Sequence, residues 1–133
     1  MRIPPEERLQ RGREAYASQF GIDAEEVDRW FAERYGDRFG EEAVSAAAGA
    51  WVDDALSLRD RSLVVVAALI VQGGVADRLR GHVRWALEHG ATREELEALC
   101  SLLAVYVGYP RASVGLEVVR EELARIEQRG GPT

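Results

Sequence analysis

Residues 57–74 read SLRDRSLVVVAALIVQGG, and this stretch decides how the rest of the chain is interpreted. The nine apolar residues 63–71 would suit either a buried strand or a helix. Ser57 and Asp60 stand before the run with the spacing of a helix cap, and Gly73-Gly74 after it is a typical helix stop. With its cap the unit is about 16 residues long, whereas strands usually have 4–8. The stretch therefore predicts a helix, and its continuous hydrophobicity predicts burial on every side.

Similar starts and stops divide the rest of the chain. Pro5, followed by acidic residues, opens a helix that ends at Gly21, and Asp23 is interpreted as the N-cap of a helix that ends at Gly36. Further helices are predicted at residues 41–51, 75–90, 92–107 and 110–128. No stretch alternates as a half-buried strand would, so the sequence predicts an all-α fold with six or seven helices.

The length of 133 residues predicts a single domain spanning 1–133. Seven of the ten aromatic residues lie at or before Trp51. We therefore expect residues 1–52 to form an N-terminal helical wrapping over a more aliphatic core at residues 56–128.

The composition excludes several chemistries. All 17 cationic side chains are Arg and none is Lys, which excludes a lysine Schiff base and a P-loop lysine. One Cys excludes an internal disulfide, a Cys-x-x-Cys pair and a zinc-thiolate cluster. The residues that remain for proton transfer are two His, one Cys, four Tyr and the carboxylates.

Charge and hydropathy bear on partners and location. A net charge of −6 disfavours nucleic acid as a partner, because binding to phosphate is driven by basic groups. The longest apolar run has nine residues, against about 20 for a membrane span, and the first residues lack the apolar stretch of a signal peptide. We therefore expect no nucleic acid and no membrane as partners, and a cytoplasmic protein.

His82 is the most informative single residue. At helical spacing it falls beside an apolar stripe, on a flank that it shares with other polar and aromatic side chains. A histidine at the edge of a buried stripe can be held partly desolvated with a lowered pKa, which suits a general acid or base near neutral pH. The alternative is a half-buried histidine satisfied by a carbonyl or carboxylate. The stripe consists of Val75, Leu79, Val83, Ala86 and Leu87, and the flank of Arg78, His82, Trp85 and His89.

The other candidate groups have simpler interpretations. His89 stands beside Gly90 at a helix end, where an imidazolium would complement the free carbonyl groups. It is seven residues from His82 rather than four, so a metal site is not expected. Cys100 is expected to be a small buried hydrophobe, and the charged residues 120–122 a solvated face.

Five stretches between Leu56 and Ile126 form one recognisable pattern. They are LSLRDRSL at 56–63, AALI at 67–70, LRGHV at 79–83 with Ala86-Leu87 and Gly90, TREEL at 92–96 and AVYVGYPRA at 104–112. On these residues the chain resembles the carboxymuconolactone decarboxylase family, which includes the alkyl hydroperoxidase D proteins. The resemblance implies an all-α fold of the alkyl hydroperoxidase D type, assembled as trimers or hexamers.

Within this family the chain is similar to the decarboxylase branch. Where the peroxidase proteins carry a Cys-x-x-Cys pair ahead of a His, this chain has Val75 and Arg78 ahead of His82. The acidic proton-relay residue of those proteins falls in the region of Ser62 and Leu63. Thiol peroxidase chemistry therefore lacks both of its thiols.

The resemblance implies a cofactor-free lyase of aromatic compound catabolism that acts on a small lactone or carboxylated metabolite. Loss of CO₂ leaves a carbanion that a lactone carbonyl can delocalise, so no cofactor is expected. His82 is the expected catalytic general acid/base. Arg78 or Arg80 would orient a carboxylate, and Tyr106 would donate to the developing oxyanion. Trp51 matches a tryptophan of the branch and is the remaining expected substrate contact.

One departure keeps other functions open. Asp53 stands where the decarboxylase branch tends to have Arg, which reverses the charge near a carboxylated substrate. Whether the chain is an enzyme is therefore left open. The alternative is a non-catalytic oligomer of the same fold that binds a small molecule or another chain. A thiol-dependent peroxidase or reductase acting through Cys100 is a third hypothesis.

Overall fold

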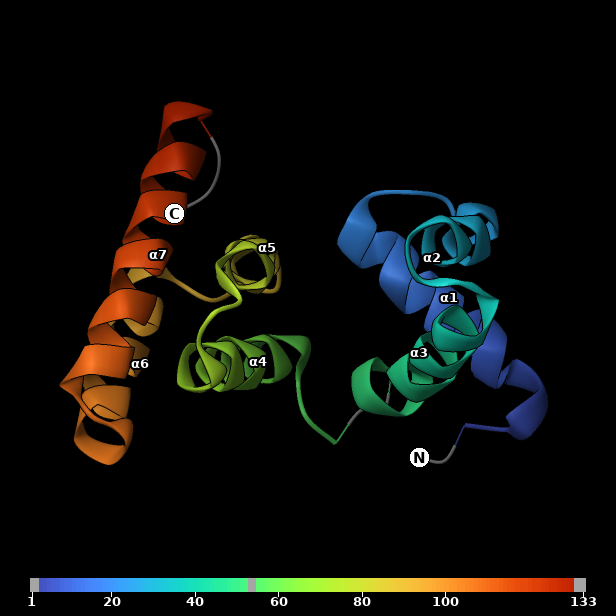
Figure 1. Cartoon of the computed structure of the whole chain (residues 1–133), viewed down its shortest axis with the longest axis horizontal. Helices are drawn as coiled ribbons and strands as arrows, with labels where there is room; N and C mark the ends of the chain where they lie inside the picture. Colours follow the sequence, from blue (N-terminus) through green and yellow to red (C-terminus); the bar gives the residue numbers. More distant parts are fainter. Residues whose placement is uncertain (1–2, 53–54, 131–133) are drawn as a thin grey trace. The chain divides into compact units, whose positions relative to one another are not determined.

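A computed structural model describes residues 3–52 and 55–130, and within them the chain is entirely helical (Figure 1). These residues form seven α-helices and one short 3-10 helix, with no strand, which confirms the predicted fold class for this part of the chain. The elements are α1 (Pro5–Phe20), the 3-10 helix η1 (Ala24–Glu26), α2 (Val27–Tyr35), α3 (Asp37–Trp51), α4 (Leu58–Gln72), α5 (Ala76–Glu88), α6 (Arg93–Val107) and α7 (Tyr109–Gln128).

The helices fall into two compact units, Met1–Leu56 and Ser57–Thr133. Each has its own hydrophobic cluster, and each is described by itself. A single domain, with the N-terminal unit wrapped over the other, stays a prediction. None of the described helices has the length and hydropathy that crossing a bilayer requires.

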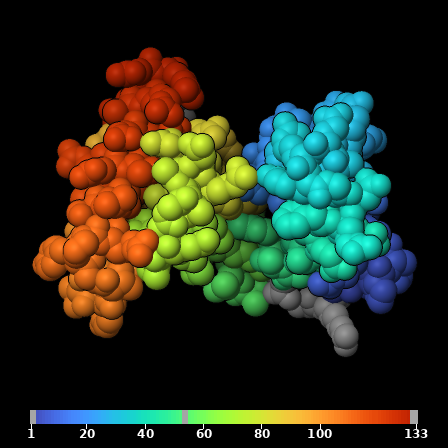
Figure 2. All heavy atoms as spheres, in the orientation of Figure 1, coloured from blue at the N-terminus to red at the C-terminus, as the bar shows by residue number. Residues whose placement is uncertain are grey.

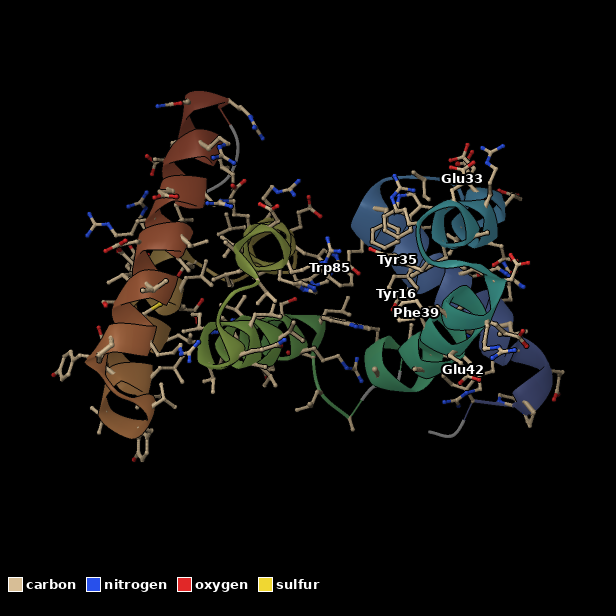
Figure 3. The ribbon with its side chains drawn as sticks, viewed as in Figure 1. Tyr16, Glu33, Tyr35, Phe39, Glu42 and Trp85 are labelled. Atoms are coloured by element: carbon tan, nitrogen blue, oxygen red, sulfur yellow. The ribbon has the colours of Figure 1, made fainter. Side chains whose placement is uncertain are left out.

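In the N-terminal unit α1 and α2 both pack against α3, and aromatic side chains join α1 to α2. The rings of Phe20 and Trp30 stack at 4.1 Å, and the Tyr16 ring meets the edge of Phe31 at 4.9 Å. The centroids of the Tyr35 and Phe39 rings are 5.0 Å apart, and Figure 3 labels both of them together with Tyr16 in this unit. The aromatics of this segment therefore build a cluster of their own.

The second unit places α5 against both α4 and α7, with α6 beside α7 (Figure 1). Figure 2 shows the side chains of α5 and α7 meeting without a gap on the face turned to the viewer. The predicted stripe of α5 is buried at Leu79, Val83, Ala86 and Leu87. It packs against a core of aliphatic side chains from the other three helices. That core includes Val66, Ile70, Leu96, Cys100, Val119, Leu123 and Ile126.

The helix starts predicted at residues 57 and 92 are confirmed, and the cap predicted at Asp23 is not. Thr92 and Glu95 form a reciprocal capping box at the start of α6. The Ser57 hydroxyl accepts from the Asp60 N–H at 3.0 Å at the start of α4. The prediction that Asp23 caps α2 is wrong, because its side chain caps nothing and a 3-10 turn comes before Val27.

Two further predictions need correction. The third helix begins at Asp37 rather than at residue 41, because Gly36, with φ of +85°, interrupts the helical backbone just before Asp37. The expectation that the apolar run of α4 is buried on every side is wrong: Val66 and Ile70 are buried, but Val64 is 60 % exposed and Val71 is 42 % exposed. One side of α4 therefore packs into the core and the other presents apolar side chains outward.

Candidate functional site

His82 lies in the middle of α5, half-buried beside the stripe that packs into the core. The centroids of its ring and the Trp85 ring are 5.9 Å apart, and the Trp85 ring is 4.7 Å from that of His89. Spacings of three and four residues bring these rings to one side of the helix, as predicted. Figure 3 shows Trp85 projecting from α5 on the side away from α7.

Burial lowers the pKa of His82 below its usual value of 6.5, because the charged ring loses hydration. The imidazole is therefore mainly neutral at pH 7, with one nitrogen that donates a proton and one that accepts. The neutral ring can accept a proton and its imidazolium form can donate one, and acid–base chemistry needs both properties. The electrostatics that we expected of His82 are present, while its catalytic role stays a prediction.

His89 connects the end of α5 to the start of α4. Its Nδ1 lies 2.7 Å from the hydroxyl oxygen of Ser62, which is fully buried. Burial lowers the pKa of His89, although Glu88 and a hydrogen bond with the backbone of Leu58 act in the opposite direction. Because burial outweighs these two effects, the ring is mainly neutral at pH 7, and the expectation of an imidazolium at the helix end is wrong.

The pairing of Ser62 with His89 was not foreseen. Ser62 stands in the region that the resemblance assigns to an acidic proton-relay residue, yet its described partner is His89. Sequence spacing gave no signal for this, because the two residues are 27 positions apart and meet only when α4 and α5 pack together.

The arginines that we expected to orient a carboxylate differ in their surroundings. Arg80 already makes ion pairs with Asp77 at 2.9 Å and with Glu121 at 3.3 Å. Its guanidinium is therefore occupied in joining α5 to α7. Arg78 is exposed on the surface of α5. Of the two alternatives, Arg78 is the more accessible to an anionic ligand.

A buried carboxylate reinforces the contact between α5 and α7. The Glu122 side chain is 2 % exposed and lies 3.4 Å from Arg84 and 3.0 Å from Arg125. A buried carboxylate is strongly unfavourable without such partners. The expectation that residues 120–122 are a solvated face is therefore wrong for Glu122, whose position inside the helix pair depends on tertiary packing.

Tyr106 and Trp51, the other two predicted substrate contacts, do not line a described cavity. Tyr106 is 79 % exposed near the end of α6, so its hydroxyl faces solvent in the single chain. Trp51 is the last residue of α3 in the N-terminal unit and is half-buried. Their roles as substrate contacts stay predictions. Asp53, where we noted the reversed charge, lies outside the described residues.

Thiolate and metal chemistry find little support in the described residues. Cys100 is buried, and burial together with the charge of Glu97 raises the pKa of its thiol to about 11. A thiol with that pKa is almost entirely protonated at pH 7 and is a poor nucleophile. Within residues 3–52 and 55–130 no group of three His, Cys, Asp or Glu side chains could hold a metal ion.

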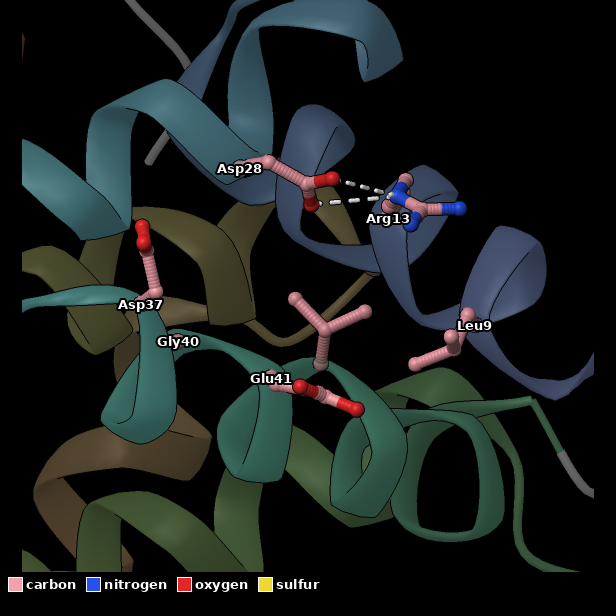
Figure 4. Close-up of a pocket in the computed structure, with 7 residues that line it drawn as sticks. Leu9, Arg13, Asp28, Asp37, Gly40 and Glu41 are labelled. Atoms are coloured by element: carbon pink, nitrogen blue, oxygen red, sulfur yellow. Dashed lines mark hydrogen bonds and ion pairs between the residues drawn. The ribbon is translucent and has the colours of Figure 1, made fainter.

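Each unit has a cavity lined by described residues. The cavity in the N-terminal unit has a volume of about 230 Å³ and lies beside the ion pair of Arg13 with Asp28, as Figure 4 shows. The cavity in the second unit has about 320 Å³ and is bounded by α4, α5 and α7. None of His82, Arg78, Arg80, Trp51 or Tyr106 lines either one.

Comparison with known proteins gives one family. The model of the carboxymuconolactone decarboxylase family matches residues 39–121. A 4-carboxymuconolactone decarboxylase of Acinetobacter baylyi (strain ATCC 33305 / BD413 / ADP1) is 32% identical over 71 residues, which cover 53% of this chain and 52% of that protein. The chain therefore spans about half the length of this curated relative.

The hydrogen bond between Ser62 and His89 gives a prediction about stability. We expect Ser62→Ala to lower the free energy of unfolding at pH 7 by about 1 kcal/mol, because one buried hydrogen bond is lost without a large change in volume. Urea denaturation followed by circular dichroism measures this change.

Ser113→Ala is the matched control, since the Ser113 hydroxyl is exposed and donates to the carbonyl of Pro110 at 3.0 Å within α7. We expect this control to alter stability by less than about 0.5 kcal/mol. Equal effects of the two substitutions would contradict a structural role for the Ser62–His89 contact.

Proposed function

The chain belongs to the carboxymuconolactone decarboxylase family, and from that premise we propose that it is a cofactor-free lyase acting on a small lactone or carboxylated metabolite, with His82 as general acid/base. The proposal rests mainly on the position of His82. Its imidazole is half-buried and has a lowered pKa, and it lies on α5, which packs against both α4 and α7. The 4-carboxymuconolactone decarboxylase relative gives the substrate class to test first.

The proposed reaction needs little from the protein beyond orientation and a proton. The bond between the carboxylate carbon and the ring breaks, CO₂ leaves, and the electron pair passes into the lactone as an enolate. His82 then gives a proton to carbon and recovers one from solvent. A lowered pKa makes the imidazolium form a stronger acid and also makes that form less abundant at pH 7.

Orientation of the substrate falls to the remaining predicted residues. A guanidinium binds a carboxylate through two parallel hydrogen bonds, and Arg78 is the more exposed of the two candidate arginines. Tyr106 would donate to the enolate oxygen once another surface covers it, because hydrogen bonds stabilise developing charge best away from water.

The second hypothesis is a non-catalytic oligomer of the same fold that binds a small molecule or another chain. This hypothesis is suggested by Asp53, which has the opposite charge to the Arg that the decarboxylase branch tends to have at this position. Thiol-dependent chemistry through Cys100 ranks below both, because the thiol is buried and its pKa is raised to about 11.

The test is the substitution His82→Gln. With 4-carboxymuconolactone and a panel of related lactone acids as probes, we expect CO₂ release by the wild-type chain and a fall in turnover of about 100- to 10,000-fold in the variant, the range typical of a lost general acid. His89→Gln is the matched control, because His89 is held by Ser62 and has no assigned role in catalysis; it should keep most of the turnover wherever it remains folded.

Unchanged turnover in His82→Gln would remove His82 from the mechanism. No CO₂ release from any probe by the folded wild-type chain would favour the non-catalytic hypothesis.

We further propose that the chain assembles with copies of itself through an apolar surface at the end of α6. Leu102, Val105 and Tyr106 recur at helical spacing and are 61 %, 73 % and 79 % exposed, and Tyr109 follows them at the start of α7. We call these four residues the α6 apolar face. Large apolar side chains exposed at successive turns of a helix, on a chain with net charge −6, are typical of an interaction site. The family resemblance favours a trimer or a hexamer.

A single charge on this face should disrupt the assembly. The chain mass is 14.7 kDa, and light scattering after size exclusion should give a multiple of it for the wild type. Leu102→Glu should shift the protein to the monomer mass, because an unpaired carboxylate would be buried at the contact. Gln128→Glu adds the same charge at the exposed end of α7 and should leave the mass unchanged. A wild type that is monomeric at micromolar concentration would contradict the proposal.

A further inference from the structure

The cavity of the second unit has the features of a ligand site. Its volume of about 320 Å³ is at the lower end of the range for small-molecule pockets, roughly 300–1,000 Å³. Apolar side chains such as Val75, Leu79, Val114 and Val118 make up most of its wall. One charged side chain lines it, that of Arg111, in the first turn of α7.

Arg111 is held in place by contacts that leave most of its donors available. One terminal nitrogen, Nη1, donates to the carbonyl oxygen of Gln72 at 3.0 Å, at the C-terminus of α4. The guanidinium lies against Gly73, whose φ is +71°, and a Cβ at Gly73 would overlap it. The end of α4 therefore positions the cation at the wall of the cavity, and an exposed side chain such as this can be reached from solvent.

The charge of Arg111 is not balanced by any carboxylate in residues 3–52 and 55–130. Most other arginines of the same unit have a described acidic partner. Those with one are Arg59, Arg80, Arg84, Arg93, Arg120 and Arg125. Asp77 directly follows Ala76, which lines the cavity, but the Asp77 carboxylate is paired with Arg80.

These features select one class of ligand. A guanidinium with several N–H groups available matches the two oxygens of a carboxylate. The apolar wall suits a hydrocarbon body attached to that carboxylate, while a phosphate or a dicarboxylate would need a second cation that the cavity does not provide. The volume limits the body to about the size of one ring or a short alkyl chain.

We propose that this cavity binds a small monocarboxylate with an apolar body, whose carboxylate pairs with Arg111 and whose body packs between Leu79 and Val114. The site goes beyond the proposed lyase function, since His82 does not line it and binding there requires no chemistry. It gives this chain a second place at which a small organic acid is recognised.

Benzoate is the probe that tests the proposal, with the ¹⁵N-labelled full chain observed by NMR. We expect saturable shifts centred on the amides of residues 73–76 and 111–115, with a dissociation constant in the millimolar range that an exposed single cation allows. Benzyl alcohol has the same ring without the charge and should bind at least about tenfold more weakly, because a charge-assisted hydrogen bond contributes about that factor or more.

Variants at Val114 separate the ligand site from the structural role of Arg111. Val114 is three positions after Arg111 on α7, so Val114→Glu places a competing carboxylate beside the guanidinium and leaves the bond to Gln72 in place. We expect it to weaken benzoate binding by about tenfold or more, while the uncharged match Val114→Gln stays within about threefold of the wild type. Arg111→Gln should abolish the binding of benzoate. Arg129→Gln removes an exposed arginine outside the cavity and should leave the binding unchanged.

Three results would overturn the proposal. One is a linear, non-saturating response to benzoate in the wild type. Another is saturable binding with shifts away from these residues. The last is equal affinity in Val114→Glu and Val114→Gln, which would leave Arg111 as a cap for α4 and nothing more.

Discussion

The burial of one side of α5 is the constraint on which the second unit depends. Leu79, Val83 and Ala86 are almost fully removed from water between α4 and α7. Each fully buried side chain of this size contributes roughly 1–3 kcal/mol, so rotation of α5 about its axis would forfeit several such contributions at once. The rotational setting of α5 then fixes which residues stand beside the stripe, and His82, Trp85 and His89 are among them.

Polar contacts with both neighbouring helices make that rotational setting of α5 specific. His89, at the C-terminal end of α5, bonds to Ser62 of α4. In the middle of α5, Arg80 and Arg84 pair with Glu121 and Glu122 of α7. Apolar burial alone tolerates small rotations and shifts, whereas a buried carboxylate such as Glu122 is acceptable only when its partners are in position. The result is a histidine held half-buried on a helix whose rotation is fixed by these contacts.

The parts of the fold that local sequence controls were predictable. The boundaries of α1 and α6 and the buried stripe of α5 follow from Pro5, Gly21, the Thr92 capping box and helical periodicity. Features that depend on tertiary packing were not. The exposed side of α4, the burial of Glu122 and the Ser62–His89 contact each require knowing which helix lies against which.

The candidate site divides along the same line. The flank of α5 that carries His82 could be placed from spacing, and burial supplies the lowered pKa that spacing suggested. The ion pairs of Arg80, and the lack of a carboxylate partner at Arg111 within the described residues, could not be predicted from the sequence. Whether a carboxylate from a distant helix faces an arginine depends on tertiary packing, which helical spacing does not reveal. The family match supports the decarboxylase interpretation without identifying the groups that carry it.

Packing of α5 holds His82 as a partly desolvated, mainly neutral imidazole. A titration of the two histidine ring signals by NMR between pH 4.5 and 8.5 tests this directly, with His89→Gln used to assign them. We expect a midpoint for His82 below 6.5, because the folded state disfavours the charged ring. A midpoint at or above 6.5 would mean that the ring is solvated or faces a carboxylate, and it would contradict the claim.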